Sequence, residues 1–335
     1  MSEWEFDPAC QAVWRAFGDG NFLDQVGGPL DVRAVVAAVR PEVKDEFLLE
    51  EVPWDRFPDG VEVREDMERL RSGGVDVGGR ALGMLMGLCA NDMRAAVAPA
   101  VPFLIRIAAD PGSSHRVEAL GVVAEVARMR HQGVCTREDM LRFRDDDEWS
   151  VEVTGYPQNW SVQAAREAIA ADTGLLLPLL HDADPALRIA AAYALAAALD
   201  RTRDIRTVFH ARLDAEQEPA VRAALVLAIA QLGRAHRHEP TVVWVRECWA
   251  DPARPAEVRM SAVLGWMCLT GLPVPNELRT VLDDLATDGM TLLMAPLPWM
   301  RAAEYLDHDG LRRCLHAMLH PDTPDPAGYS DDPWA

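Results

Sequence analysis

A pattern of apolar and polar positions first becomes clear in residues 176–199. Asp184 and Pro185 precede a run rich in Ala and Leu, and Arg188 follows four residues after Asp184. An Asp side chain accepts hydrogen bonds from the free N–H groups at a helix start, and Pro fits the first helical position. The pattern therefore predicts that an amphipathic helix begins at Asp184.

The same order of residues returns further along the chain. Arg188, Arg222, Arg259 and Arg301 stand at successive spacings of 34, 37 and 42 residues, and Glu218 takes the place of Asp184 in the second copy. Upstream, two Arg residues 36 positions apart, Arg80 and Arg116, lie in similar runs without the proline. Self-similarity at a period of about 20 to 50 residues is typical of a repeat array, in which neighbouring units bury one another's apolar faces.

Second amphipathic segments lie between the Arg-bearing runs, among them residues 98–110, 173–182, 206–215, 241–251 and 276–286. Each has about three turns of helical periodicity and ends in a polar turn, which predicts helix–turn–helix pairs without strands. The predicted fold class is therefore all-α, with the helix pairs stacked as an α-solenoid.

The segments "DPALRIAAAYAL", "EPAVRAALVLAI" and "PAVPFLIRIAADP" resemble the HEAT-repeat superfamily, in particular bacterial HEAT-like repeats of the phycobilisome-lyase type. The resemblance covers about residues 75 to 320. The spacing is mostly shorter than the roughly 40 to 47 residues usual for HEAT repeats, and the signature of tetratricopeptide repeats is absent. The resemblance implies a structural ladder in which turn carboxylates and helix arginines bridge adjacent repeats: Asp184, Arg188, Glu218, Arg222, Arg259 and Arg301.

Three parts of the chain are predicted. Residues 1–75 hold Trp4, Trp14 and Trp54 and are interpreted as an irregular helical cap, because a solenoid needs ends with a polar outer face. Residues 76–319 form the repeat array. Residues 320–335 are rich in Pro and Asp, lack apolar periodicity and are expected to form a flexible tail.

An interruption of the array contains the main candidate binding site. Arg116 and Arg188 are 72 residues apart, but the position midway, Glu152, carries no repeat signature. The insertion at about residues 145–159 brings four consecutive acids together with aromatic residues. Because aromatic side chains supply anchoring area and carboxylates supply charge complementarity, a protein-binding site is predicted there. Its members are Asp145, Asp146, Asp147, Glu148, Trp149 and Tyr156. A loop that packs its own aromatics and leaves its acids in water is the open alternative.

Charge narrows the class of partner. The 335 residues carry 53 acids against 33 basic residues, a formal net charge of −20. This charge repels a phosphate backbone and favours a basic protein as partner. No signal peptide, no apolar run of membrane-spanning length and no paired cysteine motif occurs in the sequence, which predicts a cytoplasmic protein with reduced thiols, Cys248 and Cys268 being inert core residues.

Catalytic and metal-binding patterns are weak. His316 and His320 stand four residues apart near Cys314 and His308, but no carboxylate completes a ligand set, and the "HRHEP" segment at residues 236–240 occurs once. No GxSxG, P-loop or GxGxxG is present. We therefore predict no catalytic residue, no metal and no cofactor.

The predicted function is a scaffold, adaptor or inhibitor that binds a basic protein partner in a solenoid groove, with an immunity-type protein as one possible subtype. The alternative is an enzyme or small-molecule-binding protein, lyase- or isomerase-like, that uses the same concave groove. Nucleic-acid repair would require a basic groove and fits the net charge least. The sequence leaves the oligomeric state open.

Overall fold

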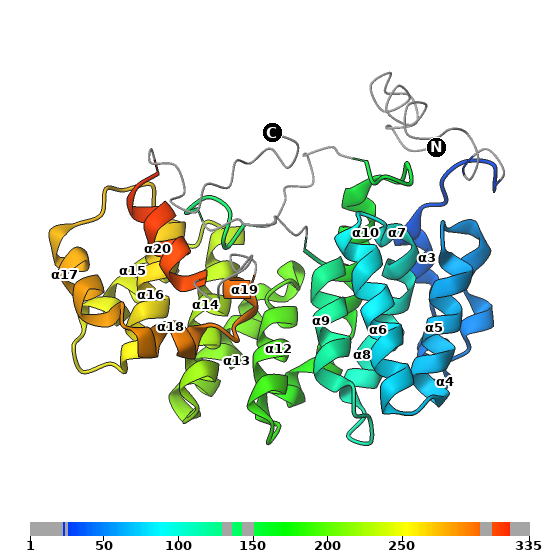
Figure 1. The fold of residues 1–335 in the computed structure, drawn as a ribbon, viewed down its shortest axis with the longest axis horizontal. Coiled ribbons are helices and arrows are strands. Elements are labelled where there is room, and N and C mark those ends of the chain that lie inside the picture. The colour runs from blue at the N-terminus through cyan, green and yellow to red at the C-terminus, as the bar shows by residue number, and fades with distance from the viewer. Residues whose placement is uncertain (1–22, 24–25, 129–135, 143–150, 302–309, 322–335) are drawn as a thin grey trace. The chain divides into compact units, whose positions relative to one another are not determined.

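The computed structural model describes residue 23 and residues 26–128, 136–142, 151–301 and 310–321 (Figure 1). All regular secondary structure in these ranges is helical. The described residues contain one β-type contact, an isolated antiparallel bridge between Val151 and Pro157. The predicted all-α fold class is thus confirmed for the described part of the chain. None of the helices in these ranges is both long and apolar enough to span a membrane. Most of the predicted tail, residues 322–335, lies outside the described residues.

The chain divides into two compact units. Unit 1 comprises residues 1–129 and 144–181, and unit 2 comprises residues 130–143 and 182–335. The division near residue 182 has no counterpart among the predicted boundaries. In unit 1, the proposed cap and the first repeats belong together, since the helix before the predicted boundary at residue 75 packs against the helix after it.

The helices of unit 1 include several short 3-10 turns, here labelled η. They are α3 (Val32–Ala38), α4 (Pro41–Glu46), η2 (Leu49–Glu51), η3 (Trp54–Arg56), α5 (Gly60–Ser72), α6 (Val75–Ala90), α7 (Arg94–Val97), η4 (Ala98–Ala100), α8 (Val101–Ala109), α9 (Arg116–Val126), α10 (Gln158–Ala171), α11 (Thr173–Leu176) and η5 (Leu177–His181).

Apolar stripes determine how the helices of unit 1 pack. The pairs α5–α6 and α8–α9 are in contact, α6 packs against α9, and α10 lies against α3, α7 and α8. Phe103, Leu104 and Leu120, from α8 and α9, are completely buried. Gly60 starts α5 directly against η3, where a Cβ atom would lie 2.0 Å from the carbonyl oxygen of Trp54. This close approach fixes the tight turn between η3 and α5.

Unit 2 contains the longest described helix, α14 (Pro219–Ala235), with 17 residues. The helices of unit 2 are α12 (Pro185–Leu195), η6 (Leu199–Arg201), α13 (Thr202–Ala215), α14 (Pro219–Ala235), α15 (Glu239–Ala250), α16 (Ala256–Leu269), α17 (Asn276–Leu285), α18 (Asp288–Met294), α19 (Pro298–Arg301) and α20 (Gly310–Leu319).

The helix starts predicted from the capping pattern are confirmed. Asp184 is the N-cap of α12, and its Oδ1 accepts a 2.9 Å hydrogen bond from the N–H of Ala186. Pro185 and Pro219 occupy the first positions of α12 and α14. Glu218 is the N-cap residue of α14, although its side chain makes no capping bond.

Helix α14 is the centre of unit 2. It packs against α12, α13, α15 and α16, and α18 contacts it as well. Every residue from Ala223 to Gly233 is buried. Gly265 of α16 faces Ala230 of α14, and a Cβ atom at Gly265 would lie 2.9 Å from the Ala230 Cβ, so glycine permits the close packing of α14 and α16. A helix that is apolar all round is a core helix, so α14 presents no open face.

The residues on either side of the interrupted repeat belong to different units. Residues 136–142 belong to unit 2, where Arg137 donates to the carbonyl oxygens of Met318 (2.8 Å) and Leu272 (2.9 Å). Arg234 of α14 donates in turn to the Arg137 and Glu138 carbonyls, and Leu141 is fully buried. Residues 151–157 instead form a turn in unit 1. The described part of the insertion, residues 151–159, therefore belongs to unit 1.

Candidate protein-binding surface

Tyr156, predicted to contact a partner, lies in the interior of unit 1. Its side chain has no exposed surface, and its hydroxyl donates to the Arg56 carbonyl (2.7 Å) and accepts from the Leu30 N–H (3.3 Å). Burial raises the pKa of Tyr156 to about 12. The ring packs 5.9 Å from that of Phe57. This position corrects the predicted role, because Tyr156 anchors the 151–157 turn to the N-terminal helices and is not presented to a partner.

The other five predicted contact residues, Asp145, Asp146, Asp147, Glu148 and Trp149, lie outside the described residues. Trp160, near the start of α10, is 4% exposed. The guanidinium of Arg33 lies 4.7 Å from the centre of the Trp160 ring.

Glu152, the residue without a repeat signature, is a completely buried carboxylate. Its Oε2 accepts from the N–H of Ala95 (3.1 Å) and from the hydroxyl of Thr154 (3.2 Å), and its Oε1 accepts from the hydroxyl of Ser161 (2.9 Å). Burial raises the pKa of Glu152 to about 8, although these donors and the nearby Arg94 favour the ionised form. The side chain ties the turn to the first residues of α7.

Arg94 is the charged neighbour of Glu152 and is itself only 1% exposed. Its Nη1 lies 2.5 Å from Asp92, and its Nη2 lies 3.9 Å from Glu125. Sequence reasoning missed this buried cluster because its members are distant along the chain. Arg94 and Glu152 are buried in unit 1, whereas the Asp92 side chain is half exposed, so we assign the two buried charges to the structure of the unit.

Two of the predicted ladder arginines make the expected ion pairs, but with carboxylates that the sequence did not indicate. Arg188 binds Glu216 with two bonds of 2.9 and 3.1 Å, and Arg222 binds Glu257 with distances of 2.7 Å from Nε and 2.6 Å from Nη2. Asp184 is used for capping instead, and Glu218 serves only as the residue that precedes α14. The pairs join consecutive helix pairs of unit 2.

The ladder arginines also bind backbone carbonyls of the turn before their own helix. Arg188 donates to the carbonyls of Asp182 and Ala183, and Arg222 donates to those at the equivalent positions six and five residues earlier. Arg259 reaches the Trp249 carbonyl (3.2 Å), whereas Arg301 ends α19 with an exposed side chain. The same turn contact at Arg188 and Arg222 gives these two arginines equivalent places in successive repeats.

Glu216 receives the largest number of donors in this ladder. Besides Arg188, it accepts from Arg212 (2.5 Å) and from the N–H groups of Gln217 and Glu218 (both 2.9 Å). Burial disfavours its ionised form, but the Glu218 N–H and the Arg188 guanidinium outweigh that penalty and lower the pKa of Glu216. A carboxylate shortly before a Pro-marked helix start was the available sequence signal for this residue.

No metal-binding constellation is found among the described residues. The rings of His316 and His320 lie 5.3 Å apart between centres, as their spacing predicts. His238 accepts a hydrogen bond from the N–H of Thr241 and so caps α15. Burial raises the pKa of Cys248 to about 11 and that of Cys268 to about 12, and both are free, buried thiols as predicted.

Exposed acidic side chains gather in the N-terminal part of unit 1, on α4, on α5 and on the segment between them. From residue 42 to residue 68, ten carboxylate side chains are exposed, whereas Lys44 is buried and Arg56 and Arg64 are only partly exposed. We call these ten residues the acidic surface: Glu42, Asp45, Glu46, Glu50, Glu51, Asp55, Asp59, Glu62, Glu65 and Glu68. Four of them form ion pairs, namely Asp45, Glu51, Glu65 and Glu68. The other six have no ion pair within the described part of the chain.

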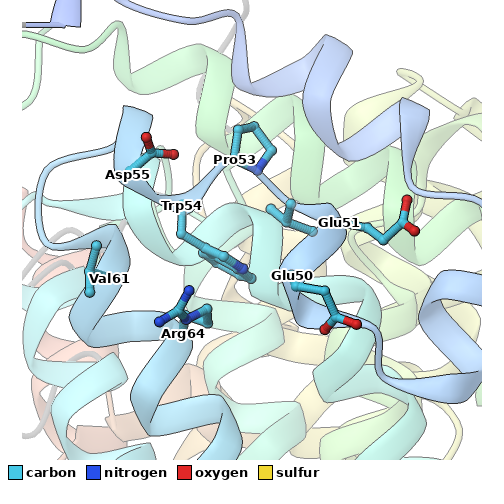
Figure 2. A pocket seen from close by; sticks show the side chains of 8 residues that line it. Glu50, Glu51, Pro53, Trp54, Asp55, Val61 and Arg64 are labelled. Carbon is cyan, nitrogen blue, oxygen red and sulfur yellow. The ribbon is translucent and has the colours of Figure 1, made fainter.

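The acidic surface contains a pocket of about 320 Å³. Three carboxylates, those of Glu50, Glu51 and Asp55, line it together with Arg64. Figure 2 shows Trp54 and Arg64 in the middle of the pocket, with Asp55 and Val61 toward one side and Glu50 and Glu51 toward the other. Three carboxylates against one guanidinium leave the pocket with an excess of negative charge.

The floor of this pocket is held by short-range contacts. Trp54 is 2% exposed, and its indole N–H donates a 2.7 Å hydrogen bond to the Leu49 carbonyl across the η2–η3 turn. At the edge of the acidic surface, partial burial and the neighbouring Glu62 carboxylate raise the pKa of Asp59.

No protein-family model, no curated protein and no solved structure matches this chain. The function has to be argued from the site itself.

Proposed function

We propose that the chain is a scaffold, adaptor or inhibitor that binds a basic protein partner through the acidic surface. One observation carries the proposal: ten exposed carboxylates lie between residues 42 and 68, and the three basic residues of the same segment are buried or only partly exposed. Surface carboxylates are common, but in a segment of this length without one fully exposed basic side chain we expect a negative electrostatic potential. Such a potential attracts a basic surface and rejects phosphate backbones.

The repeated Arg–Glu pairs support a HEAT-like reading of the helix pairs. Arg188–Glu216 joins α12 to the turn before α14, and Arg222–Glu257 joins α14 to the first turn of α16, with the arginines 34 residues apart. We propose on this basis that unit 2 is built from stacked repeats of the α-solenoid kind. A rigid stack of helices suits a scaffold because it holds a binding face in a fixed shape.

The alternative function puts a substrate in a groove lined by the Arg-bearing helices. Helix α14 is one of these Arg-bearing helices, and it is buried from Ala223 to Gly233. Because α14 has no free face in unit 2 to line a groove, we favour binding on an outer surface. An immunity-type inhibitor of a basic toxin is one subtype of the proposed function, because opposite charge accelerates encounter and suppresses wrong partners.

Affinity capture from native cell extract tests the proposal. The baits are the full chain and a variant in which Glu42, Glu46, Glu50, Asp55, Asp59 and Glu62 are neutralised to Gln or Asn. These are the six carboxylates of the acidic surface without an ion pair in the described ranges, so their loss should leave the fold intact. We expect basic proteins on the wild-type bait at low salt and their loss at high salt or on the variant. Retention of the same proteins by both baits, or capture that is indifferent to salt, contradicts the proposal.

A second matched bait separates the acidic surface from the insertion. Neutralising Asp145, Asp146, Asp147 and Glu148 removes four charges at a different place in the chain. If the acidic surface is the main binding site, this bait should retain the captured partner better than the six-residue variant does. The reverse order would move the site to the insertion.

A further inference from the structure

A second pocket adjoins the acidic one. It has a volume of about 300 Å³ and shares Glu51, Val52 and Pro53 with the acidic pocket. The two pockets therefore lie on either side of the same short segment between η2 and η3. Side chains bound in both at once would be close neighbours in the binding partner.

The second pocket differs from the first in chemistry. Its lining consists mainly of small and aliphatic side chains, from α3, from the start of α4 and from the shared segment: Ala34, Val35, Ala38, Val39, Val43, Val52 and Pro53. The charged members of the lining are Arg40 and Glu51, which lie 3.4 Å apart as an exposed ion pair. A pocket of this kind accepts an aliphatic side chain but offers little to a charged one.

Both pockets are supported by anchored residues, which suits a preformed binding site. Val39, Val43 and Val52 have their side chains buried on the inner side of the lining. The main chain of the shared segment is fixed by turn bonds, in which the N–H of Val52 donates to the Leu49 carbonyl (3.2 Å) and the N–H of Trp54 donates to the Val52 carbonyl (2.9 Å). The distance between the pockets is thereby fixed as well.

We propose that the two pockets dock a short segment of a protein partner in which an aliphatic side chain stands next to an arginine or lysine. The aliphatic side chain fills the pocket between α3 and the shared segment. The stem of the basic side chain lies along Pro53 and Val61, and its cationic group lies among the Glu50, Glu51 and Asp55 carboxylates. This inference rests on the proposed function and specifies the kind of partner.

Charge complementarity selects this occupant over others. The apolar pocket adjoins the acidic pocket, and the exposed charged side chains from residue 42 to residue 68 are carboxylates; the exposed Arg40 at the apolar pocket is paired with Glu51. A second copy of the chain would bring the same negative face, and an anionic lipid surface or a nucleic acid would be repelled by it. A wholly apolar segment would leave the Glu50 and Asp55 carboxylates of the acidic pocket without an ion-pair partner.

The valines of the two pockets allow a direct test. Val35 and Val39 line the apolar pocket, Val61 lines the acidic pocket, and Val52 belongs to both. The full chain, labelled with carbon-13 in its valine methyl groups, is titrated with three capped dipeptides and followed by NMR. The probes are acetyl-Leu-Arg-amide, acetyl-Leu-Gln-amide and acetyl-Ser-Arg-amide.

We expect acetyl-Leu-Arg-amide to shift the methyl signals of both pockets along one saturable curve. The Leu-Gln and Ser-Arg probes should each bind about fivefold more weakly or worse, since each lacks one of the two interactions. Equal affinity for all three probes, or no saturable shift of Val61 with Val35 or Val39, overturns the inference.

Three variants at exposed positions connect the binding to each pocket. Ala38→Arg fills the apolar pocket and should abolish the shift of Val35 with the Leu-Arg probe. The double change Glu50→Lys with Asp55→Lys reverses the charge of the acidic pocket and should reduce binding at least fivefold. Glu62→Lys changes the charge of the same surface but lines neither pocket, and it should reduce binding less than twofold. An equal loss in the Glu62→Lys variant means that binding depends on general charge and contradicts the two-pocket site.

Failure of this inference is distinguishable from failure of the proposed function. If salt-sensitive capture of basic proteins survives in the Ala38→Arg and double Lys variants, the scaffold function stands and the two-pocket site is wrong. If the Leu-Arg probe binds both pockets while the chain captures no basic protein from the extract, the pockets stand and the scaffold function is wrong.

Discussion

At the scale of single residues, the interior of unit 1 contains the least expected feature of the protein, a buried ionisable Glu152. Its neighbours come from three different parts of the chain, with Ala95 on α7, Thr154 in the turn and Ser161 on α10. No local pattern predicts such a contact. The carboxylate combines a large desolvation penalty with three hydrogen-bond donors, and its protonation therefore couples to the stability of the fold.

The pKa of Glu152 predicts how stability depends on pH. Because burial raises the folded-state pKa from 4.5 to about 8, the folded protein holds the proton more tightly than the unfolded chain does. The stabilising effect is complete below about pH 4.5 and is lost as the pH rises toward 8. Thermal unfolding of wild type and Glu152→Gln should show a difference in melting temperature that moves in favour of the Gln variant across this range.

The informative quantity in that experiment is how the difference in melting temperature between the two proteins changes with pH. An amide at residue 152 replaces an acceptor by a donor, which adds a constant offset at every pH. Glu62→Gln, at an exposed position, serves as the control. Its melting temperature should change with pH in the same way as that of the wild type. If the melting temperatures of the wild type and the Glu152→Gln variant differ by the same amount from about pH 5 to about pH 8, Glu152 does not titrate in this range.

The ladder arginines provide a second prediction at this scale. Arg222→Ala should lower the free energy of unfolding by about 1–3 kcal/mol, because it leaves the 7% exposed Glu257 without its guanidinium partner. Arg254→Ala, which removes an exposed ion pair with Asp251, should change it by less than about 0.5 kcal/mol. Urea unfolding measures both, and partner binding per folded molecule should be unaffected. Equal effects of the two substitutions would show that Arg222 has no structural role.

At the scale of helices, the 16-residue helix α6 contains glycines at two positions where its packing leaves room for a larger side chain. Gly83 and Gly87 face open space, since a Cβ atom at either position would have no atom within 4 Å, whereas one at Gly78 would lie 2.5 Å from the ring of His115. Gly83→Ala and Gly87→Ala should each stabilise the protein by about 0.5–1 kcal/mol, because alanine restricts the unfolded chain and favours the helix.

Gly78→Ala, in the same helix, is the matched control and should destabilise the protein. Chemical denaturation of the three variants measures the differences. Destabilisation by Gly83→Ala or Gly87→Ala would indicate that the face of α6 is covered in solution.

The sequence was sufficient to predict those elements whose signals are local. Asp184 and Pro185 mark a helix start by capping alone, and the regular spacing of Arg188 and Arg222 marks equivalent places in successive helix pairs. What Arg188 binds depends on Glu216, which lies 28 residues further along, and that pairing follows from how the helices stack. Tyr156 shows the same limit, because its partners lie at residues 30 and 56, and an aromatic residue in a polar insertion resembles a surface contact until those helices are in place.

At the scale of the whole molecule, net charge was the most useful property of the sequence. The excess of 20 negative charges indicated a basic partner but not where it binds. The structure adds that the segment from residue 42 to residue 68 exposes ten carboxylates and that this segment lines two adjoining pockets. The pockets escaped sequence reasoning because they form where short helices and 3-10 turns meet, and these elements have little periodicity.

The association rate constant of the chain with its captured partner tests the central proposal most directly. It should be measured by stopped flow as a function of ionic strength, for the wild type and for the variant with Glu42, Glu46, Glu50, Asp55, Asp59 and Glu62 neutralised. We expect a wild-type rate that falls steeply with salt, and a variant rate that is lower at low salt and nearly flat, with the two converging near physiological ionic strength, where screening acts beyond about 8 Å. Parallel salt dependences of equal slope would contradict the proposal that the acidic surface recruits the partner.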